Sequence, residues 1–163
     1  NEVISDEKKP EYDENCYLCP GNDRINGGTN HKYESCYVFD NDFPAVLKDE
    51  VSFDLQQEDL FKINPERGIN RVICFSPKHN ITLAEMQVPE IENVIKVWKE
   101  QYLELGAIDY INHVQIFENK GSVMGCSNPH PHGQIWAQSS LPTQVKKTQD
   151  NLLKYYQIFH QIS

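Results

Sequence analysis

The sequence predicts an α+β fold built on a mainly antiparallel β-sheet. Four short segments have the composition of strands, two longer segments have helical periodicity, and the order of these elements is not the regular alternation of βαβ units. The 163 residues suit one domain that buries a core without disulfide bonds. We expect this single domain to span residues 1–163, with residues 1–14 flexible.

Four segments are expected to form the strands. They are rich in β-branched and aromatic residues and are bounded by turn-forming residues: 35–41, 69–76, 111–119 and 132–138. In the third segment, Val114 and Ile116 alternate with polar and aromatic neighbours, which is typical of a strand that buries one face.

Two amphipathic helices accompany the strands. Segment 89–105 has apolar residues at helical spacing, with Pro89 near its first turn and Gly106 just past its end, so we expect a helix that covers one sheet face. A second helix is expected over 143–161, and we interpret its aromatic side chains as core or interface. Segment 49–68 lacks clear periodicity and is expected to be a surface loop.

Charge and hydropathy exclude several classes of partner. The chain carries 15 basic and 24 acidic residues, a net charge of −9, and no block of Lys and Arg longer than a pair. Nucleic acid is therefore not an expected partner, because binding to a phosphate backbone needs clustered positive charge. No apolar run is long enough to span a membrane. The odd number of cysteines, five, argues against a disulfide framework, and we expect a cytoplasmic protein.

A metal site is indicated by the pair Cys16 and Cys19 in "CYLC", which a turn-rich stretch follows directly. Such a pair alone fits a redox pair, half of a zinc site or a coincidence. Two further ligands of suitable chemistry, His79 and His130, lie on turn-like segments. We therefore favour zinc as the interpretation of the pair.

The stretch "GCSNPHPHGQIWA", residues 125–137, is the strongest functional pattern. Its two prolines favour extended backbone and lead into a strand, with Pro131 at a sheet edge or just before full pairing. Strand alternation then places His130, His132, Gln134 and Trp136 on one face. A proline-rich loop that happens to carry histidines is the alternative.

These motifs resemble the galactose-1-phosphate uridylyltransferase family of the histidine-triad superfamily. The likeness rests on "CYLC", "NDF" at 41–43, "RVICFSPKH", "FENKG" and the stretch 125–137, and it runs from about residue 16 to residue 142. It implies a histidine-triad-like fold and the first of two related halves. It also implies that a histidine carries a uridylyl group from UDP-glucose to galactose 1-phosphate, and that the full-length protein is a homodimer.

The resemblance also assigns roles to individual residues. It implies His132 as the nucleophile, with Gln134 and Ser127 stabilising charge on the phosphoryl group. The zinc ligands that it implies are Cys16, Cys19, His79 and His130. The substrate contacts that it implies are Ile25, with Tyr17 and Phe39, around uracil, Asn41 and Asp42 at the ribose, Asn119 at a phosphate, and Gly125, Cys126 and Ser127 beside the reacting group.

Two alternative functions remain open at this point. A related enzyme could use the same histidines on an adenine nucleotide, because spacing does not determine the base. A zinc-stabilised binding module without turnover would fit a chain that lacks the second half. The sequence does not distinguish zinc from iron in the site. We expect no second metal, since Thr148 stands where some members of the family have a glutamate ligand.

Overall fold

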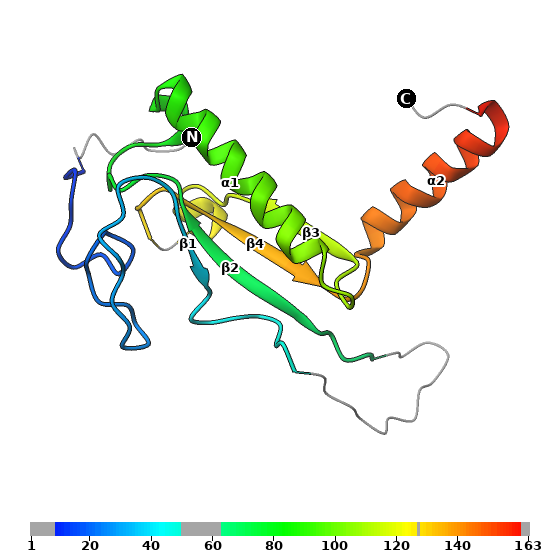
Figure 1. The fold of residues 1–163 in the computed structure, drawn as a ribbon, viewed down its shortest axis with the longest axis horizontal. Helices are drawn as coiled ribbons and strands as arrows, with labels where there is room; N and C mark the ends of the chain where they lie inside the picture. The colour runs from blue at the N-terminus through cyan, green and yellow to red at the C-terminus, as the bar shows by residue number, and fades with distance from the viewer. Residues whose placement is uncertain (1–8, 50–62, 127, 161–163) are drawn as a thin grey trace.

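A four-stranded antiparallel sheet forms the centre of the molecule in the computed structural model, which describes residues 9–49, 63–126 and 128–160. The strands are β1 (Tyr37–Asp40), β2 (Gly68–Cys74), β3 (His113–Phe117) and β4 (His132–Gln138), in the order β1-β2-β4-β3. Figure 1 shows the sheet with one helix across it. The expected α+β fold with an antiparallel sheet is confirmed.

Strand β4 lies inside the sheet and carries the histidine motif. It pairs with β2 on one side, with His132 opposite Cys74, and with β3 on the other, with Gln134 opposite Phe117. Pro131 comes directly before β4, and its carbonyl still accepts a hydrogen bond from the Phe75 N–H at 3.2 Å. The motif therefore enters the sheet at the start of full pairing, where a missing proline N–H disturbs no ladder.

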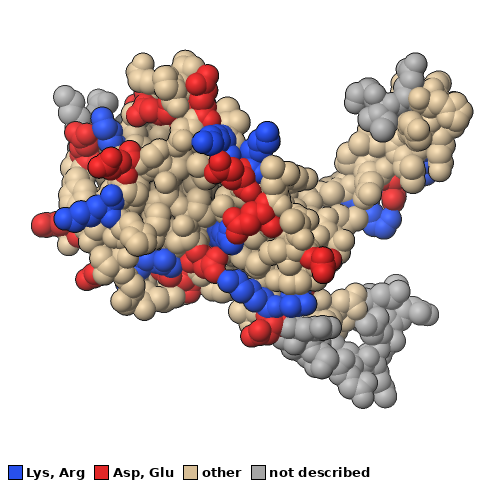
Figure 2. Space-filling view, in the orientation of Figure 1, with Lys and Arg blue, Asp and Glu red and all other residues tan. Residues whose placement is uncertain are grey.

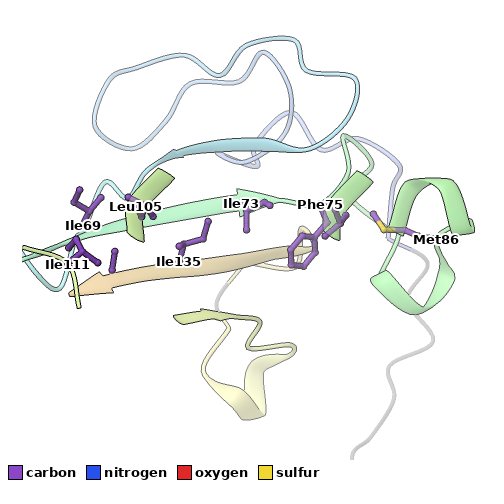
Figure 3. Close-up of a cluster of buried hydrophobic side chains, with 9 residues drawn as sticks. Ile69, Ile73, Phe75, Met86, Leu105, Ile111 and Ile135 are labelled. Carbon is purple, nitrogen blue, oxygen red and sulfur yellow. The ribbon is translucent and has the colours of Figure 1, made fainter. Parts of the chain in front are cut away.

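Helix α1 (Val88–Gly106) covers one face of the sheet, as expected. It begins at a capping box, in which the carboxylate of Glu90 accepts the Gln87 N–H at 2.8 Å. Its Val94 and Leu105 are fully buried. They pack with the inward side chains of β2 and β4 in the main core, drawn in Figure 3. Burial of this face holds helix and sheet together.

Helix α2 (Thr143–Phe159) corrects one expectation. Its periodicity gives a helix as expected, but none of its residues is buried, and Figure 1 shows it standing away from the sheet. Leu152, Tyr155 and Phe159 are 42–55% exposed. Helix α1 already covers the core face of the sheet, so the interpretation of these aromatic side chains as core is wrong. Their interpretation as an interface stays a prediction.

The segments outside these elements bear on the remaining expectations. Of segment 49–68, residues 50–62 lie outside the described residues, and Leu47 forms a bridge with Arg67 at its two ends. Domain limits and terminal flexibility stay predictions, although the carbonyl of Glu11 accepts the His79 N–H at 2.8 Å.

No helix in the described ranges is long and apolar enough to cross a membrane. Figure 2 shows acidic and basic side chains interspersed over the visible face.

Candidate functional site

Four buried side chains that lie far apart in the sequence form a cluster suited to a metal ion. Cys16 and Cys19 belong to a turn closed by a 3.1 Å backbone hydrogen bond, His79 follows β2, and His130 precedes β4. Their ligand atoms all lie within 4.8 Å of one another. The Cys19 Sγ is 3.5 Å from Nδ1 of each histidine. The four predicted ligands are therefore brought together.

The geometry and chemistry of this cluster fit a tetrahedral metal with sulfur and nitrogen ligands. Zinc bonds of about 2.3 Å to sulfur and about 2.0 Å to nitrogen at a tetrahedral angle separate the two atoms by about 3.5 Å. Burial raises the pKa of the Cys19 thiol to about 11 and lowers the pKa of His130 to about 4. A cation lets the buried thiol ionise, and the neutral imidazole is the form that binds metal.

Polar side chains around the cluster fix the ligands in place. The second ring nitrogen of His130, Nε2, lies 3.0 Å from the Ser76 carbonyl, which leaves Nδ1 to face the cluster. The buried Asn30 donates to the carbonyls of Tyr17 and Cys19 at 2.8 and 3.1 Å, and so holds the cysteine turn. Asn30 and Ser76 were not predicted from the sequence, because no local pattern marks a residue that hydrogen-bonds a distant partner.

His132 is held in one orientation by its own motif. Along β4 the burial alternates, with Gly133, Ile135 and Ala137 buried and the intervening side chains on the open face, as expected. The Nδ1 atom of His132 lies 2.7 Å from the carbonyl oxygen of His130. A carbonyl only accepts, so Nδ1 carries the proton and Nε2 keeps a free lone pair. The imidazole therefore has the tautomer that a nucleophile requires.

Two hollows meet at His132. The first, of about 170 Å³, has both apolar and polar side chains in its lining. Its lining comprises Tyr17, Leu18, Ile25, Phe39, Asn41, Asp42, Phe43, Val72, His132 and Gln134. The second, of about 380 Å³, includes Asn119, Cys126 and Lys120 together with His132. A ligand that extends from one hollow to the other would pass the free nitrogen of His132.

The amide of Gln134 is oriented by Trp136, two residues further along β4. The indole N–H of Trp136 donates to Oε1 of Gln134 at 3.1 Å. An indole nitrogen can only donate, so this contact identifies the oxygen of the amide and leaves its NH₂ group as a donor toward the hollow. The predicted site residue Gln134 thus presents a hydrogen-bond donor beside His132.

The structure brings together most of the predicted substrate contacts. Ile25, Asn41 and Asp42 line the first hollow with His132 and Gln134, and Tyr17 and Phe39 lie there too. Asn119 and Cys126 line the second hollow.

Two predicted residues stand apart from this arrangement. Gly125 lines neither hollow; it ends the 3-10 turn Ser122–Met124 in a left-handed conformation, with φ of 78°. Ser127 lies outside the described residues. Their roles therefore stay predictions.

A central strand that carries an oriented histidine beside a buried Cys2His2 cluster is suited to a metal-stabilised domain with a histidine nucleophile. The chain belongs to the family described as "Galactose-1-phosphate uridyl transferase, N-terminal domain", which it matches over residues 1–142. The resemblance drawn from the motifs is confirmed.

Relatives and solved structures support this assignment. The chain is 53% identical over 158 residues to the galactose-1-phosphate uridylyltransferase of Haemophilus influenzae, covering 94% of this chain and 45% of that protein. It also resembles a solved uridylyltransferase structure, with a TM-score of 0.77, 23% identity and coverage of 98% of this chain and 49% of the other. An Arabidopsis thaliana ADP-glucose phosphorylase with bound ADP-glucose shares the fold, with a TM-score of 0.67, 22% identity and coverage of 95% and 49%. The chain thus spans about half the length of the relatives that it matches.

Proposed function

We propose that this chain is the catalytic first half of an enzyme that exchanges a uridylyl group between UDP-glucose and galactose 1-phosphate through His132. The observation that carries the proposal is the 2.7 Å contact from Nδ1 of His132 to the His130 carbonyl, which leaves Nε2 free where the two hollows meet. Relatives of 42–53% identity that carry the name galactose-1-phosphate uridylyltransferase support this choice of substrates.

In the first half-reaction, Nε2 of His132 attacks the α-phosphorus of UDP-glucose. A phosphorus–nitrogen bond forms, and the bond from that phosphorus to the bridging oxygen breaks. Glucose 1-phosphate leaves with the electron pair, and the uridylyl group stays on His132. The Nδ1 proton remains on the ring and its bond to the His130 carbonyl supports the positive charge that develops there.

In the second half-reaction, a phosphate oxygen of galactose 1-phosphate attacks the same phosphorus. The phosphorus–nitrogen bond breaks, UDP-galactose forms, and the lone pair returns to Nε2 of His132. No net proton is gained or lost. The Gln134 amide, whose NH₂ group Trp136 leaves available, donates to a phosphoryl oxygen in both transition states, together with Ser127.

The first hollow is assigned to the nucleoside. The uracil lies between Ile25, Tyr17 and Phe39, and the ribose hydroxyls bond to Asn41 and Asp42. The second hollow takes the sugar phosphate, with Asn119 and Cys126 as contacts. These local donors explain how a chain of net charge −9 accepts an anionic substrate.

Zinc is the metal that we assign to Cys16, Cys19, His79 and His130. When bound it supplies folding energy, because four protein ligands leave no open position for a substrate. His130 serves both the cluster and His132, so the ligand set also holds the nucleophile's acceptor in place.

The full-length protein is proposed to be a cytoplasmic homodimer. None of the five cysteines forms a disulfide in the structure, which suits a reducing compartment. The apolar side chains on α2 provide surface for an interface.

Two observations support alternative functions, which the experiment must distinguish from the proposed one. The fold is shared with an ADP-glucose phosphorylase, so adenine nucleotides are a rival substrate class. The chain covers less than half of its relatives' length, which favours a non-catalytic zinc module if the missing half completes the site.

The proposal is tested by intact-mass measurement after the purified chain is mixed with UDP-glucose or ADP-glucose. We expect the mass of one uridylyl group to be gained with UDP-glucose alone. His132→Gly should abolish the gain. His113→Gly, a histidine on β3 that lines neither hollow, is the matched control and should retain it.

The other outcomes are equally informative. Labelling by ADP-glucose would favour the adenine alternative. If the chain binds metal and UDP but gains no mass, the isolated half is a binding module and the catalytic proposal fails for it.

A further inference from the structure

We propose that Arg24 is the positioning residue of the nucleoside hollow: it fixes the Asp42 carboxylate for the ribose hydroxyls and cancels its charge toward the substrate phosphates. This inference rests on the proposed function, and it concerns a residue to which neither the motifs nor the relatives' names assign a role. Arg24 lies in the turn-rich stretch after the cysteine pair, directly before Ile25.

Arg24 binds the Asp42 carboxylate through two different nitrogens of its guanidinium. Its Nε donates to Oδ2 of Asp42 at 3.1 Å, and a terminal nitrogen donates to Oδ1. That nitrogen also donates to the Asp40 carbonyl at 2.9 Å. The side chains of Arg24 and Asp42 are only 17% and 11% exposed. A fork of this kind fixes both the position and the plane of a carboxylate, which a single contact does not.

The same guanidinium also supports the base end of the hollow. Its central carbon lies 4.0 Å from the centre of the Phe39 ring. Phe39 and Ile25 both line the hollow, whereas Arg24 does not. Arg24 therefore acts from behind the lining, through the ring on one side and the carboxylate on the other.

Charge gives a second reason for the pair. Within the part of the chain that the structure describes, Asp42 is the one carboxylate that lines this hollow. An unpaired carboxylate would repel a diphosphate bound nearby, and the repulsion would be strong in a partly buried site. Arg24 removes it, while each carboxylate oxygen keeps a lone pair for a ribose hydroxyl.

The matched control is Arg71, whose side chain is also 17% exposed and also pairs with carboxylates. Its partners are Asp40, Gln101 and Glu104, the last two on α1, and it does not line the hollow. Arg71→Gln thus removes the same number of atoms and breaks ion pairs to two half-exposed carboxylates, without touching Asp42.

The experiment measures dissociation constants of the chain, purified with zinc, for UDP, 2′-deoxy-UDP and uridine, alongside the Tm of each variant. The wild type should favour UDP over 2′-deoxy-UDP. Arg24→Gln should weaken UDP at least about tenfold, the effect of one hydrogen bond to a charged group, and lose most of the preference for the 2′-hydroxyl. Arg71→Gln should keep both the affinity and the preference.

Two more variants separate position from charge. Arg24→Lys keeps the positive charge but loses the fork, so it should lose the preference for the 2′-hydroxyl and keep the ratio of UDP to uridine affinity. In the Arg24→Gln background, adding Asp42→Asn should strengthen UDP binding by removing the unpaired charge.

Three results would overturn the inference. Arg24→Gln could retain the wild-type preference for UDP over 2′-deoxy-UDP. Arg24→Gln could instead weaken all three ligands equally while lowering Tm, which would make Arg24 purely structural. Finally, a folded wild-type chain that binds neither UDP nor uridine would overturn both the proposed function and this inference. If the wild type binds UDP tightly and Arg24→Gln has no effect, as in the first result, only the inference is overturned.

Discussion

Replacing Cys19 by alanine should destabilise the domain far more than replacing Cys74, although both side chains are fully buried in the same cluster. The Cys19 Sγ faces Nδ1 of two histidines at 3.5 Å. The Cys74 Sγ has a 4.0 Å contact to the Leu18 carbonyl and interacts with Tyr33, and it is not one of the four clustered side chains. Each substitution removes one buried sulfur atom, but only Cys19→Ala removes a proposed metal ligand.

The expected difference is large. Loss of one buried sulfur costs about 1–2 kcal/mol, which lowers Tm by about 2–8 °C in a domain of this size. Structural zinc sites contribute about 10–16 kcal/mol in small peptides at pH 7, as much as the whole stability of many domains, about 5–15 kcal/mol. Cys19→Ala should therefore unfold the cysteine turn or the entire domain, whereas Cys74→Ala should melt cooperatively a few degrees below the wild type.

The assay combines thermal melting with measurement of metal per chain, before and after treatment with a chelator. Chelation should lower the Tm of the wild type and of Cys74→Ala, and should have no further effect on Cys19→Ala. Equal losses of Tm in the two variants, together with a wild-type Tm that metal removal does not move, would refute the reasoning.

Three further predictions concern other parts of the fold. Burial alone would raise the pKa of Glu66, but hydrogen bonds from Ser140 and Ser139 outweigh it and lower the pKa. Denaturant titrations should therefore show Glu66→Gln less stable than wild type at pH 7, with the difference vanishing as pH falls through the folded pKa; a constant difference would contradict this. Gly133→Ala should cost about 1–3 kcal/mol in the same titrations, because its Cβ would lie 2.9 Å from the Phe117 carbonyl oxygen; wild-type stability would argue against so tight a contact. Gln134→Ala should slow uridylylation of His132 by about 10²–10³-fold in rapid-quench assays, and an unchanged rate would remove Gln134 from the transition state.

Local patterns predicted the strands of the sheet because each strand has its own alternation or its own β-branched and aromatic composition. The alternation in β4 follows from its sequence, and the burial of Gly133, Ile135 and Ala137 matches it. The cluster was predictable for a related reason, since His79 and His130 lie on turn-like segments and the resemblance implied them as ligands with the cysteine pair. Its assembly still required β2 and β4 to lie side by side, which brings His79 and His130 together.

Contacts between distant segments could not be predicted from the sequence. The Arg24–Asp42 pair joins residues 18 apart, and the Glu66–Ser139 contact joins residues 73 apart. Charged and hydroxyl side chains are common on surfaces, so nothing in the sequence singles out these partners. Helix α2 shows the same limit: amphipathic periodicity predicts a helix with an apolar side, but it does not tell what covers that side.

His130 links the candidate metal cluster to the proposed nucleophile, His132, because it belongs to the cluster and lies two residues before His132. Its Nδ1 faces Cys19, its Nε2 faces the Ser76 carbonyl, its N–H donates to Asn128 at 2.8 Å, and its carbonyl accepts from His132. Every polar group of this buried residue is therefore engaged, so the residue has no freedom to turn without breaking several contacts at once. The carbonyl of His130 selects the tautomer of His132. A displacement of His130 within the cluster would therefore also move the hydrogen-bond acceptor that orients the His132 ring. The proposed metal site would thus act on His132 by position alone, without contacting the substrate.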